Sequence, residues 1–404
     1  MGDEPDEFAN PTGSSSTGGD ATLWTAYLNG GIVPRGETFA SVVREIAARA
    51  GVDTAPIDRS QPRDRANELL MDFFALCSSE LRGKAGTQAR TYLEGRGFPP
   101  NAIDHVDLGV VPSELFTKNA LEAAGYSELE IARSGVLADG RWPGRLCGAW
   151  HDERGTVRTL WARSLRDSDS SARYLYLRGA SRSGLPPYGL SEILGMPPSD
   201  RREVVLVEGL IDVYHLRAKG FRNVAGIGGS RVQPGAVAGL QRLGFESVVL
   251  ALDNDMPGRK GIVGAIDLIT RSEDAPALRV LEPAVLADSK DPDAFVQTHG
   301  AAPFRTLVDE AECAISWRAR DLITGVTPQD DVRERRAALR RAGEWLGALP
   351  ARYALEQEDA VRHVADQCGY SRAAVERAFR ARFWGTERQR TPERSRGMSM
   401  ARER

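Results

Sequence analysis

Acidic residues at the ends of apolar runs stand out in the middle of the chain, and they point to metal chemistry. Glu208 ends the run VVLVE, and Asp253 and Asp255 end the run SVVLALDND. Mg²⁺ prefers hard oxygen ligands, usually one or two carboxylates together with water and phosphate. Side chains two residues apart in an extended backbone point the same way, which would pair the two aspartates. We therefore predict Glu208, Asp253 and Asp255 as catalytic and metal-binding residues.

Further carboxylates follow the first of these strands and a later one. Asp212 lies one helical turn beyond Glu208 and could face the same side, and SKDPDAF adds Asp291 and Asp293 after a later strand. An aspartate after a strand often caps the next helix, and K-D-P-D also forms an ordinary turn. The combination E-G-x-x-D and D-x-D, in this order, favours metal binding over capping alone. The predicted metal ligands are Glu208, Asp212, Asp253, Asp255, Asp291 and Asp293.

The elements that must position these side chains alternate regularly from Glu203 onward. Short apolar strands are predicted at VVLVE, NVAGIGG, SVVLALD and ALRVLEP, and helices at LIDVYHLRAKG, PGAVAGLQRLG and GRKGIVGAIDLI. Such alternation predicts a parallel, doubly wound sheet, whose ligands gather at the carboxyl ends of the strands.

The whole chain is predicted to be α/β, with an α+β organisation overall. The stretches TVRTLWARSL and RYLYL alternate as strands do, and FASVVREIAARAG carries a helical stripe. We expect a disordered leader at 1–20, a small helical element at 21–60, an α+β subdomain at 61–200, the parallel-sheet domain at 201–295, a helical region at 296–384 and a disordered tail at 385–404.

Composition excludes several classes. The chain has 404 residues, 41% of them hydrophobic, and a formal net charge of −3, so nucleic-acid contacts need a local concentration of positive charge. None of the four cysteines forms a C-x₂-C pair, so no structural zinc is expected. No run reaches the roughly 18 apolar residues of a membrane span, and the acidic start does not match a signal peptide. We expect a cytoplasmic protein without a membrane partner.

A local positive concentration does occur between Arg154 and Arg182. This segment contains seven arginines and only two aspartates, and Trp161, Tyr174 and Tyr176 lie among them. Guanidinium groups that meet phosphates, and aromatic faces that stack on bases, suit a single-stranded nucleic acid. The alternative is a solvated strand edge over an aromatic core.

The acidic motifs carry a family resemblance. VVLVEGLIDVYHL and VVLALDNDMPGRKG resemble the two signature motifs of the TOPRIM domain, which primases, type IA and II topoisomerases, OLD-type nucleases and small repair proteins share. In that family the glutamate and the D-x-D aspartates bind a divalent metal for phosphoryl transfer or phosphodiester cleavage. The resemblance implies Mg²⁺ or Mn²⁺ as the cofactor.

The flanking sequence resembles the catalytic core of DnaG-type DNA primases from about residue 89 to 312, including ARTYLEGRGFPPNAIDHVDLGVVP and KDPDAFVQTHGAAPFRTLVDEA. The resemblance implies a nucleotidyltransferase that makes short RNA primers from nucleoside triphosphates on a single-stranded DNA template. It places Arg145, Arg163, Arg173 and Tyr174 on the family's basic positions for template and nucleotide, where the family's Lys-Tyr is Arg-Tyr here. Arg182 and Lys290 are further candidates for these contacts.

Some features depart from the family, and other functions stay open. The zinc ribbon that precedes the FASVVREIAARAG helix in those enzymes is not recognisable, and a Gly/Ser-rich leader stands in its place. The helical region weakly resembles the connection to a helicase-binding domain, which makes a replicative helicase a candidate partner. Alternatives are a TOPRIM nuclease and a non-catalytic nucleic-acid-binding accessory protein of a mobile element or defence system. No strand-cleaving tyrosine module supports a topoisomerase, and no histidine is assigned a function.

Overall fold

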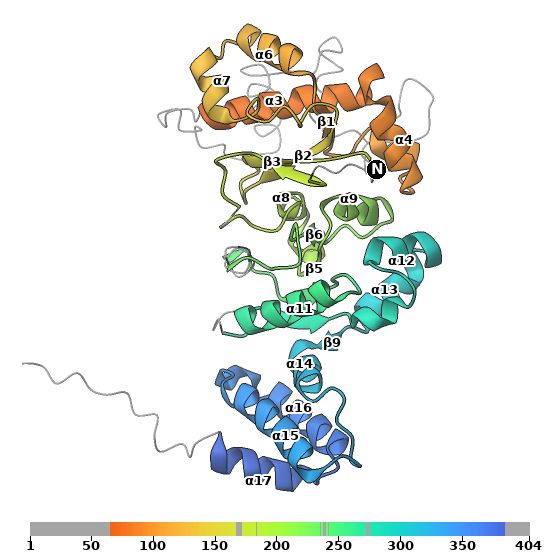
Figure 1. Cartoon of the computed structure of the whole chain (residues 1–404), viewed down its shortest axis with the longest axis vertical. Helices are drawn as coiled ribbons and strands as arrows, with labels where there is room; N and C mark the ends of the chain where they lie inside the picture. The colour runs from red at the N-terminus through yellow and green to blue at the C-terminus, as the bar shows by residue number, and fades with distance from the viewer. Residues whose placement is uncertain are drawn as a thin grey trace, which may run out of the picture. The chain divides into compact units, whose positions relative to one another are not determined.

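The structure is a computed structural model that describes residues 65–166, 172–182, 184–234, 236, 240, 242–271 and 275–383. The predicted leader, the predicted helical element at 21–60 and the predicted tail lie outside the described residues. The chain from Arg65 onward forms one unit, in which two sheets and a group of C-terminal helices follow one another (Figure 1).

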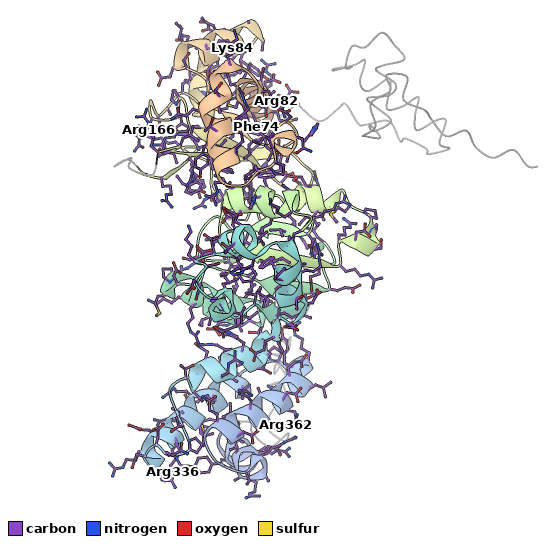
Figure 2. All side chains as sticks on the ribbon, turned by 90° about the vertical axis from the view of Figure 1, so that its right-hand side faces the viewer. Phe74, Arg82, Lys84, Arg166, Arg336 and Arg362 are labelled. Carbon is purple, nitrogen blue, oxygen red and sulfur yellow. The ribbon has the colours of Figure 1, made fainter. Side chains whose placement is uncertain are left out.

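A four-stranded antiparallel sheet and its helices form the first part of the unit. The strands, in sheet order, are β1 (Gly109–Val110), β2 (Leu146–His151), β3 (Val157–Arg163) and β4 (Tyr174–Tyr176). The helices are α3 (Arg65–Arg82), η1 (Lys84–Gly86), α4 (Thr87–Gly95), α5 (Pro100–Ile103), α6 (Glu114–Ala123) and α7 (Glu128–Ser134). Helix α3 covers the sheet with an apolar face that includes Leu69 and Phe73. Arg82 is its last residue, and Lys84 begins η1 (Figure 2). The strands predicted from TVRTLWARSL and RYLYL are present as β3 and β4, although β3 is buried at all but one position.

The second sheet has the order β6-β5-β7-β8-β9. Its strands are β5 (Glu203–Val207), β6 (Val224–Gly226), β7 (Ser247–Leu250), β8 (Ala277–Val280) and β9 (Glu312–Cys313). The helices around it are α8 (Leu190–Leu194), η2 (Pro198–Asp200), α9 (Leu210–Ala218), α11 (Met256–Ile269), η3 (Pro283–Leu286), α12 (Pro292–His299) and α13 (Ala301–Asp309). The first four strands in the order are parallel, which confirms the predicted sheet.

Burial on both faces explains why these strands read as continuous apolar runs. Val205 and Val249 belong to the core on one face of the sheet, and Leu206 and Leu250 belong to the core on the other. Strands buried on both sides lose the polar alternation of a half-exposed sheet. The helical region predicted at 296–384 has one departure, because the two-residue strand β9 pairs antiparallel with β8 before α14 begins.

A cluster of aromatic rings joins the two sheets. Trp150 and Trp161 from the first sheet meet the ring of Tyr188 edge-on, and so does Tyr214 of α9. The backbone of Tyr188 exchanges two hydrogen bonds of 2.7 and 2.9 Å with Gly226 of β6. The rings and this backbone pair fix the first sheet relative to the acidic end of the second.

The remaining helices have a core of their own. They are α14 (Ala314–Leu322), α15 (Val332–Gly347), η4 (Ala351–Tyr353), α16 (Ala354–Gln367) and α17 (Arg372–Arg382). Leu346 and Val361 lie in their shared core, while Arg336 and Arg362 are exposed on α15 and α16 (Figure 2). Among the described residues, no helix combines the length and apolar character that a bilayer crossing requires.

Candidate metal and nucleotide site

Glu208 and Asp253 meet at the carboxyl end of the parallel sheet. Glu208 directly follows β5, and Asp253 follows the neighbouring strand β7. The Glu208 Oε1 atom accepts a hydrogen bond of 3.3 Å from the backbone N–H of Asp253. Two strands that run in parallel therefore deliver both residues to one edge, as the strand order requires.

Asp255 has a structural role beside this pair. It is the N-cap of α11, and its Oδ1 accepts a 2.7 Å hydrogen bond from the backbone N–H of Gly258. The amino end of a helix carries a partial positive charge, which favours an ionised carboxylate there. Asp255 therefore caps a helix, as the alternative interpretation of the sequence expected. The capping hydrogen bond fixes its carboxylate two residues after Asp253.

Two glycines make room for the acidic groups. A Cβ atom on Gly209 would lie 1.9 Å from the Asp212 Oδ2 atom. A Cβ atom on Gly258 would lie 2.2 Å from the backbone oxygen of Asp253 and 3.0 Å from Glu208 Oε1. These distances explain why both acidic motifs contain glycine: a side chain at either position would displace a carboxylate.

Glu208 and Asp253 have no cationic side chain as a partner in the described part of the chain. Burial raises the pKa of Glu208, with a further rise from Asp255 and Asp291. Burial and the charge of Glu208 raise the pKa of Asp253 to about 8. The Asp253 Oδ1 atom is buried and has no hydrogen-bond partner, and neither residue forms an ion pair in the described part of the chain. An uncompensated pair of hard oxygen donors fits a divalent cation.

A hydrogen bond between loops brings Asp291 to the same edge. The backbone N–H of Asn254 donates to the carbonyl of Lys290 at 2.7 Å, which ties the D-x-D loop to the K-D-P-D segment. Asp291 caps α12 by accepting a 2.7 Å hydrogen bond from the backbone of Ala294, and it pairs with the Lys290 ammonium at 3.0 Å. Asp291 is thus a cap with a cationic partner of its own.

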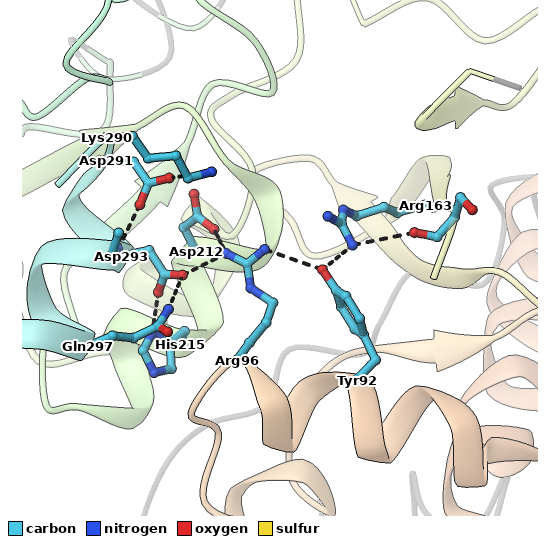
Figure 3. A network of polar contacts seen from close by, with 11 residues as sticks. Tyr92, Arg96, Arg163, Asp212, His215, Lys290, Asp291, Asp293 and Gln297 are labelled. Atoms are coloured by element: carbon cyan, nitrogen blue, oxygen red, sulfur yellow. Dashed lines mark hydrogen bonds and ion pairs between the residues drawn. The ribbon is translucent and has the colours of Figure 1, made fainter. Parts of the chain in front are cut away.

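Asp212 and Asp293 are held by a guanidinium group that the sequence reasoning missed (Figure 3). Arg96, the C-cap of α4, places its Nη2 atom 2.9 Å from Asp212 Oδ1 and 2.6 Å from Asp293 Oδ2. Asp293 also accepts hydrogen bonds from His215 Nδ1 and, at 2.8 Å, from Gln297 Nε2. Although burial alone would raise it, the pKa of Asp293 is lowered by the hydrogen bond from His215 and by the charge of Arg96.

The six predicted metal ligands therefore lie close together but are not equivalent. Within the described ranges, no three acidic, histidine or cysteine side chains already surround a common point. Arg96 holds Asp212 and Asp293, and the helix caps hold Asp255 and Asp291. The full ligand set stays a prediction, and its best-fitting part is the edge formed by Glu208 and Asp253.

The predicted basic residues divide into buried and exposed members. Arg163 ends β3, is buried, stacks on the Tyr92 ring at 4.8 Å and donates a hydrogen bond to the Tyr92 hydroxyl. Arg145 is 5% exposed and donates to the carbonyls of Arg141 and Ala172. Both side chains thus have clear structural roles, and their contacts with template or nucleotide stay predictions.

The other basic candidates are more accessible. Arg173 is exposed beside Tyr174, and the Lys290 side chain is 76% exposed. Arg182 stacks on the Tyr176 ring at 3.9 Å and donates a 3.1 Å hydrogen bond to the carbonyl of Gly228, in the loop after β6. Arg173 and Lys290 are therefore exposed members of the predicted set.

The sequence offered only weak signals for the residues it missed. Arg96 lies in the run ARTYLEGRGFPP, whose likeness to a known family did not identify a role for it. His215 lies three residues after Asp212 on an apolar helix, so the two side chains share a face. A histidine at such a position is equally compatible with a purely structural place in the core. The neighbouring Gly97 has φ +83°, and a Cβ atom there would lie 3.2 Å from His215 Nε2.

Comparison with known proteins agrees with this architecture. The Toprim domain family matches residues 202–278. The DNA primase of Chlamydia trachomatis is 25% identical over 313 residues, which cover 74% of this chain and 51% of the primase. The DNA primase of Deinococcus radiodurans is 29% identical over 250 residues, which cover 57% of this chain and 41% of that protein. The chain thus spans about half the length of the curated relatives it matches.

Solved structures show the same fold. The RNA polymerase domain of Mycobacterium tuberculosis primase DnaG in complex with double-stranded DNA has a TM-score of 0.63 and 22% identity, and covers 77% of this chain and 99% of that one. A DnaG primase catalytic domain bound to single-stranded DNA also has a TM-score of 0.63, with 21% identity, and covers 77% of this chain and 98% of that one.

Proposed function

We propose, from the premise that the chain has a Toprim domain within the fold of a bacterial DnaG-type primase core, that it synthesises short RNA primers on single-stranded DNA. In this reaction the 3′-hydroxyl of the growing strand attacks the α-phosphate of the next nucleoside triphosphate. A phosphodiester bond forms, pyrophosphate leaves, and the hydroxyl proton passes to solvent or to a carboxylate.

The observation that carries the proposal is the uncompensated pair of Glu208 and Asp253 at the end of two parallel strands. When bound, Mg²⁺ or Mn²⁺ stabilises charge on the phosphates and favours the ionised hydroxyl. Glu208, Asp253 and Asp255 would hold that ion, with Asp291 next to them across the Asn254 backbone contact. Asp212 and Asp293 complete the proposed acidic set.

The cationic side chains would hold the other partners of the reaction. We call the carboxyl end of the parallel sheet, with its six predicted metal ligands, the acidic edge. Lys290 projects from it and suits the triphosphate, because an ammonium group acts as a compact point charge on phosphate. Arg173 and Tyr174 suit the phosphates and bases of a single-stranded template. Arg145, Arg163 and Arg182 would act behind them, through their contacts with backbone carbonyls and aromatic rings.

Primer synthesis tests the proposal directly. The protein is incubated with single-stranded DNA, all four labelled nucleoside triphosphates and Mg²⁺ or Mn²⁺, and the products are resolved by length. Products longer than a dinucleotide are expected. The Glu208→Gln variant loses one proposed metal ligand. Its rate of primer synthesis should therefore be at least about a hundredfold lower than that of wild type. Glu246→Gln is the matched control, because Glu246 is an exposed acid directly before β7 that pairs with Arg202.

Other results would support different functions. Fragments of a labelled strand, with no extension, would favour the Toprim nuclease. A Glu208→Gln protein that keeps its biological effect would favour a non-catalytic accessory role. As a primase the protein would act in the cytoplasm, and a pull-down with the replicative helicase would test that partner.

A further inference from the structure

The acidic edge contains carboxylates in two different electrostatic states. Glu208 and Asp253 have no cationic partner in the described part of the chain. Asp293 is fully buried and receives donors from Arg96, His215 and Gln297. One half of the edge therefore lacks a cationic side chain, and the other half already contains one.

The Arg96 guanidinium occupies the place of a bridging cation. A single nitrogen, Nη2, lies within hydrogen-bond distance of both Asp212 and Asp293. The arginine does not clamp either carboxylate with two parallel hydrogen bonds, and its buried Nε atom has no partner. One positive centre between two carboxylate oxygens from different segments is also the arrangement that a divalent cation would need there.

Arg96 is anchored from its other side as well. Its Nη1 atom donates a 3.3 Å hydrogen bond to the Tyr92 hydroxyl, which also accepts from Arg163 (Figure 3). Tyr92 and Arg96 both belong to the α4 segment, whereas the two aspartates belong to α9 and α12. Since the side chain has a second partner outside the acidic pair, it can leave the carboxylates without losing every hydrogen bond.

We propose that Arg96 is a resident counter-cation in one half of the site, and that a second divalent ion binds at Asp212 and Asp293 only when this guanidinium is displaced. The inference rests on the proposed divalent-metal site at Glu208 and Asp253. It makes the two halves unequal: the uncompensated half binds an ion first and tightly, and the half that contains Arg96 binds one weakly. Arg96 is then a positioning residue that sets how many ions the protein holds.

Mn²⁺ binding to the full chain, without nucleotide or template, tests this directly. The electron paramagnetic resonance signal of free Mn²⁺ gives the number of bound ions and their affinities. Wild-type protein is expected to show one tight and one weak site. In Arg96→Met, which keeps an apolar stem but removes the charge, the weak site should tighten by about tenfold or more. Arg96→Lys keeps a positive charge and should resemble wild type.

Arg279→Met is the matched control. Arg279 is a half-buried arginine that pairs with Glu203 at 3.0 Å, at the opposite end of β5 from the acidic edge. Its removal should lower thermal stability without changing either Mn²⁺ affinity. A change in this variant equal to that in Arg96→Met would show that loss of stability, and not of the local charge, alters binding, and would overturn the inference.

A second variant keeps the inference testable if Arg96→Met does not fold. Asp212→Asn should lose the weak site and keep the tight one. Loss of the tight site in Asp212→Asn, or unchanged weak binding in Arg96→Met, would overturn the inference. Failure of the proposed function has a different signature: wild-type protein would bind Mn²⁺ in the predicted pattern but extend no primer. Wild-type protein that binds no Mn²⁺ would overturn both the metal site and the role of Arg96.

Discussion

Replacement of Gly258 by alanine should damage the acidic site although it adds only a methyl group. Gly258 lies in the first turn of α11, where its backbone N–H donates to the Asp255 carboxylate at 2.7 Å. The added Cβ atom would lie 2.2 Å from the Asp253 backbone oxygen and 3.0 Å from Glu208 Oε1. Backbone atoms cannot move aside as a flexible side chain can, so the helix or the D-x-D loop must shift.

The size of the effect follows from these distances. Non-bonded carbon–oxygen contacts begin near about 3.3 Å, so the two segments must separate by about 1 Å. Overpacking of this kind costs about 1–3 kcal/mol, and loss of an N-cap costs about 1 kcal/mol, which together lower the free energy of unfolding by about 2–4 kcal/mol. A misplacement of about 1 Å can reduce a reaction rate by roughly a hundredfold. Primer synthesis should therefore fall more than stability alone accounts for.

Thermal unfolding, Mn²⁺ binding and primer synthesis measure the three consequences. Gly264→Ala is the control in the same helix, because Gly264 is exposed and its Cβ would have no neighbour within 4 Å. Alanine there should stabilise the protein by about 0.5–1 kcal/mol and leave Mn²⁺ affinity unchanged. The reasoning is refuted if Gly258→Ala is as stable as Gly264→Ala and binds Mn²⁺ as wild type does.

Three further predictions concern pH, the loop after β6 and the helix α9. Burial and the charge of Glu208 raise the pKa of Asp253 from 3.8 to about 8, so neutral Asp253 stabilises the metal-free fold and this contribution is lost as pH rises through that interval. Melting temperatures without metal should show this loss in wild type and not in Asp253→Asn; equal pH profiles would contradict it. Arg182→Ala should weaken single-stranded DNA binding and, if the guanidinium meets a phosphate, reduce the slope of log affinity against log salt by about one; an unchanged affinity and slope would exclude that contact. Arg217→Met removes hydrogen bonds to the carbonyls of Gly189 and Val224, and chemical denaturation should show a loss of about 2 kcal/mol. Its Mn²⁺ affinity should stay that of wild type, and a change there would link α9 packing to the metal site.

The parallel sheet and the meeting of Glu208 with Asp253 could be predicted because both depend on local patterns. Strands buried on two faces are apolar throughout, so VVLVE and SVVLALD can be recognised as strands from the sequence. The carboxyl ends of neighbouring parallel strands lie at the same end of the sheet, which brings Glu208 and Asp253 together. The helix-capping role of Asp255 and Asp291 was also available as an alternative, because an aspartate before a helix has a local consequence. The two-residue strand β9 was too short to leave a periodic signal.

Exposure of the basic residues could not be read from the sequence in the same way. The arginines between Arg154 and Arg182 look alike as a charge run, yet Arg163 is buried against Tyr92 whereas Arg173 is exposed. An arginine can bury its guanidinium where an aromatic ring or a backbone carbonyl of another element contacts it, and such partners need not be neighbours in sequence. Burial of a long charged side chain is therefore a property of the packed molecule.

The amino-acid sequence by itself determined which carboxylates lie at the end of the sheet, because strand, turn and helix signals act over a few residues. Only the tertiary structure decided which of those carboxylates already have a cation. Arg96 lies 116 positions from Asp212 and 197 from Asp293, and no local pattern connects residues so far apart. Their contact exists because α4, α9 and α12 pack together, and packing between distant segments is what turns a set of acidic residues into two unequal halves of a site.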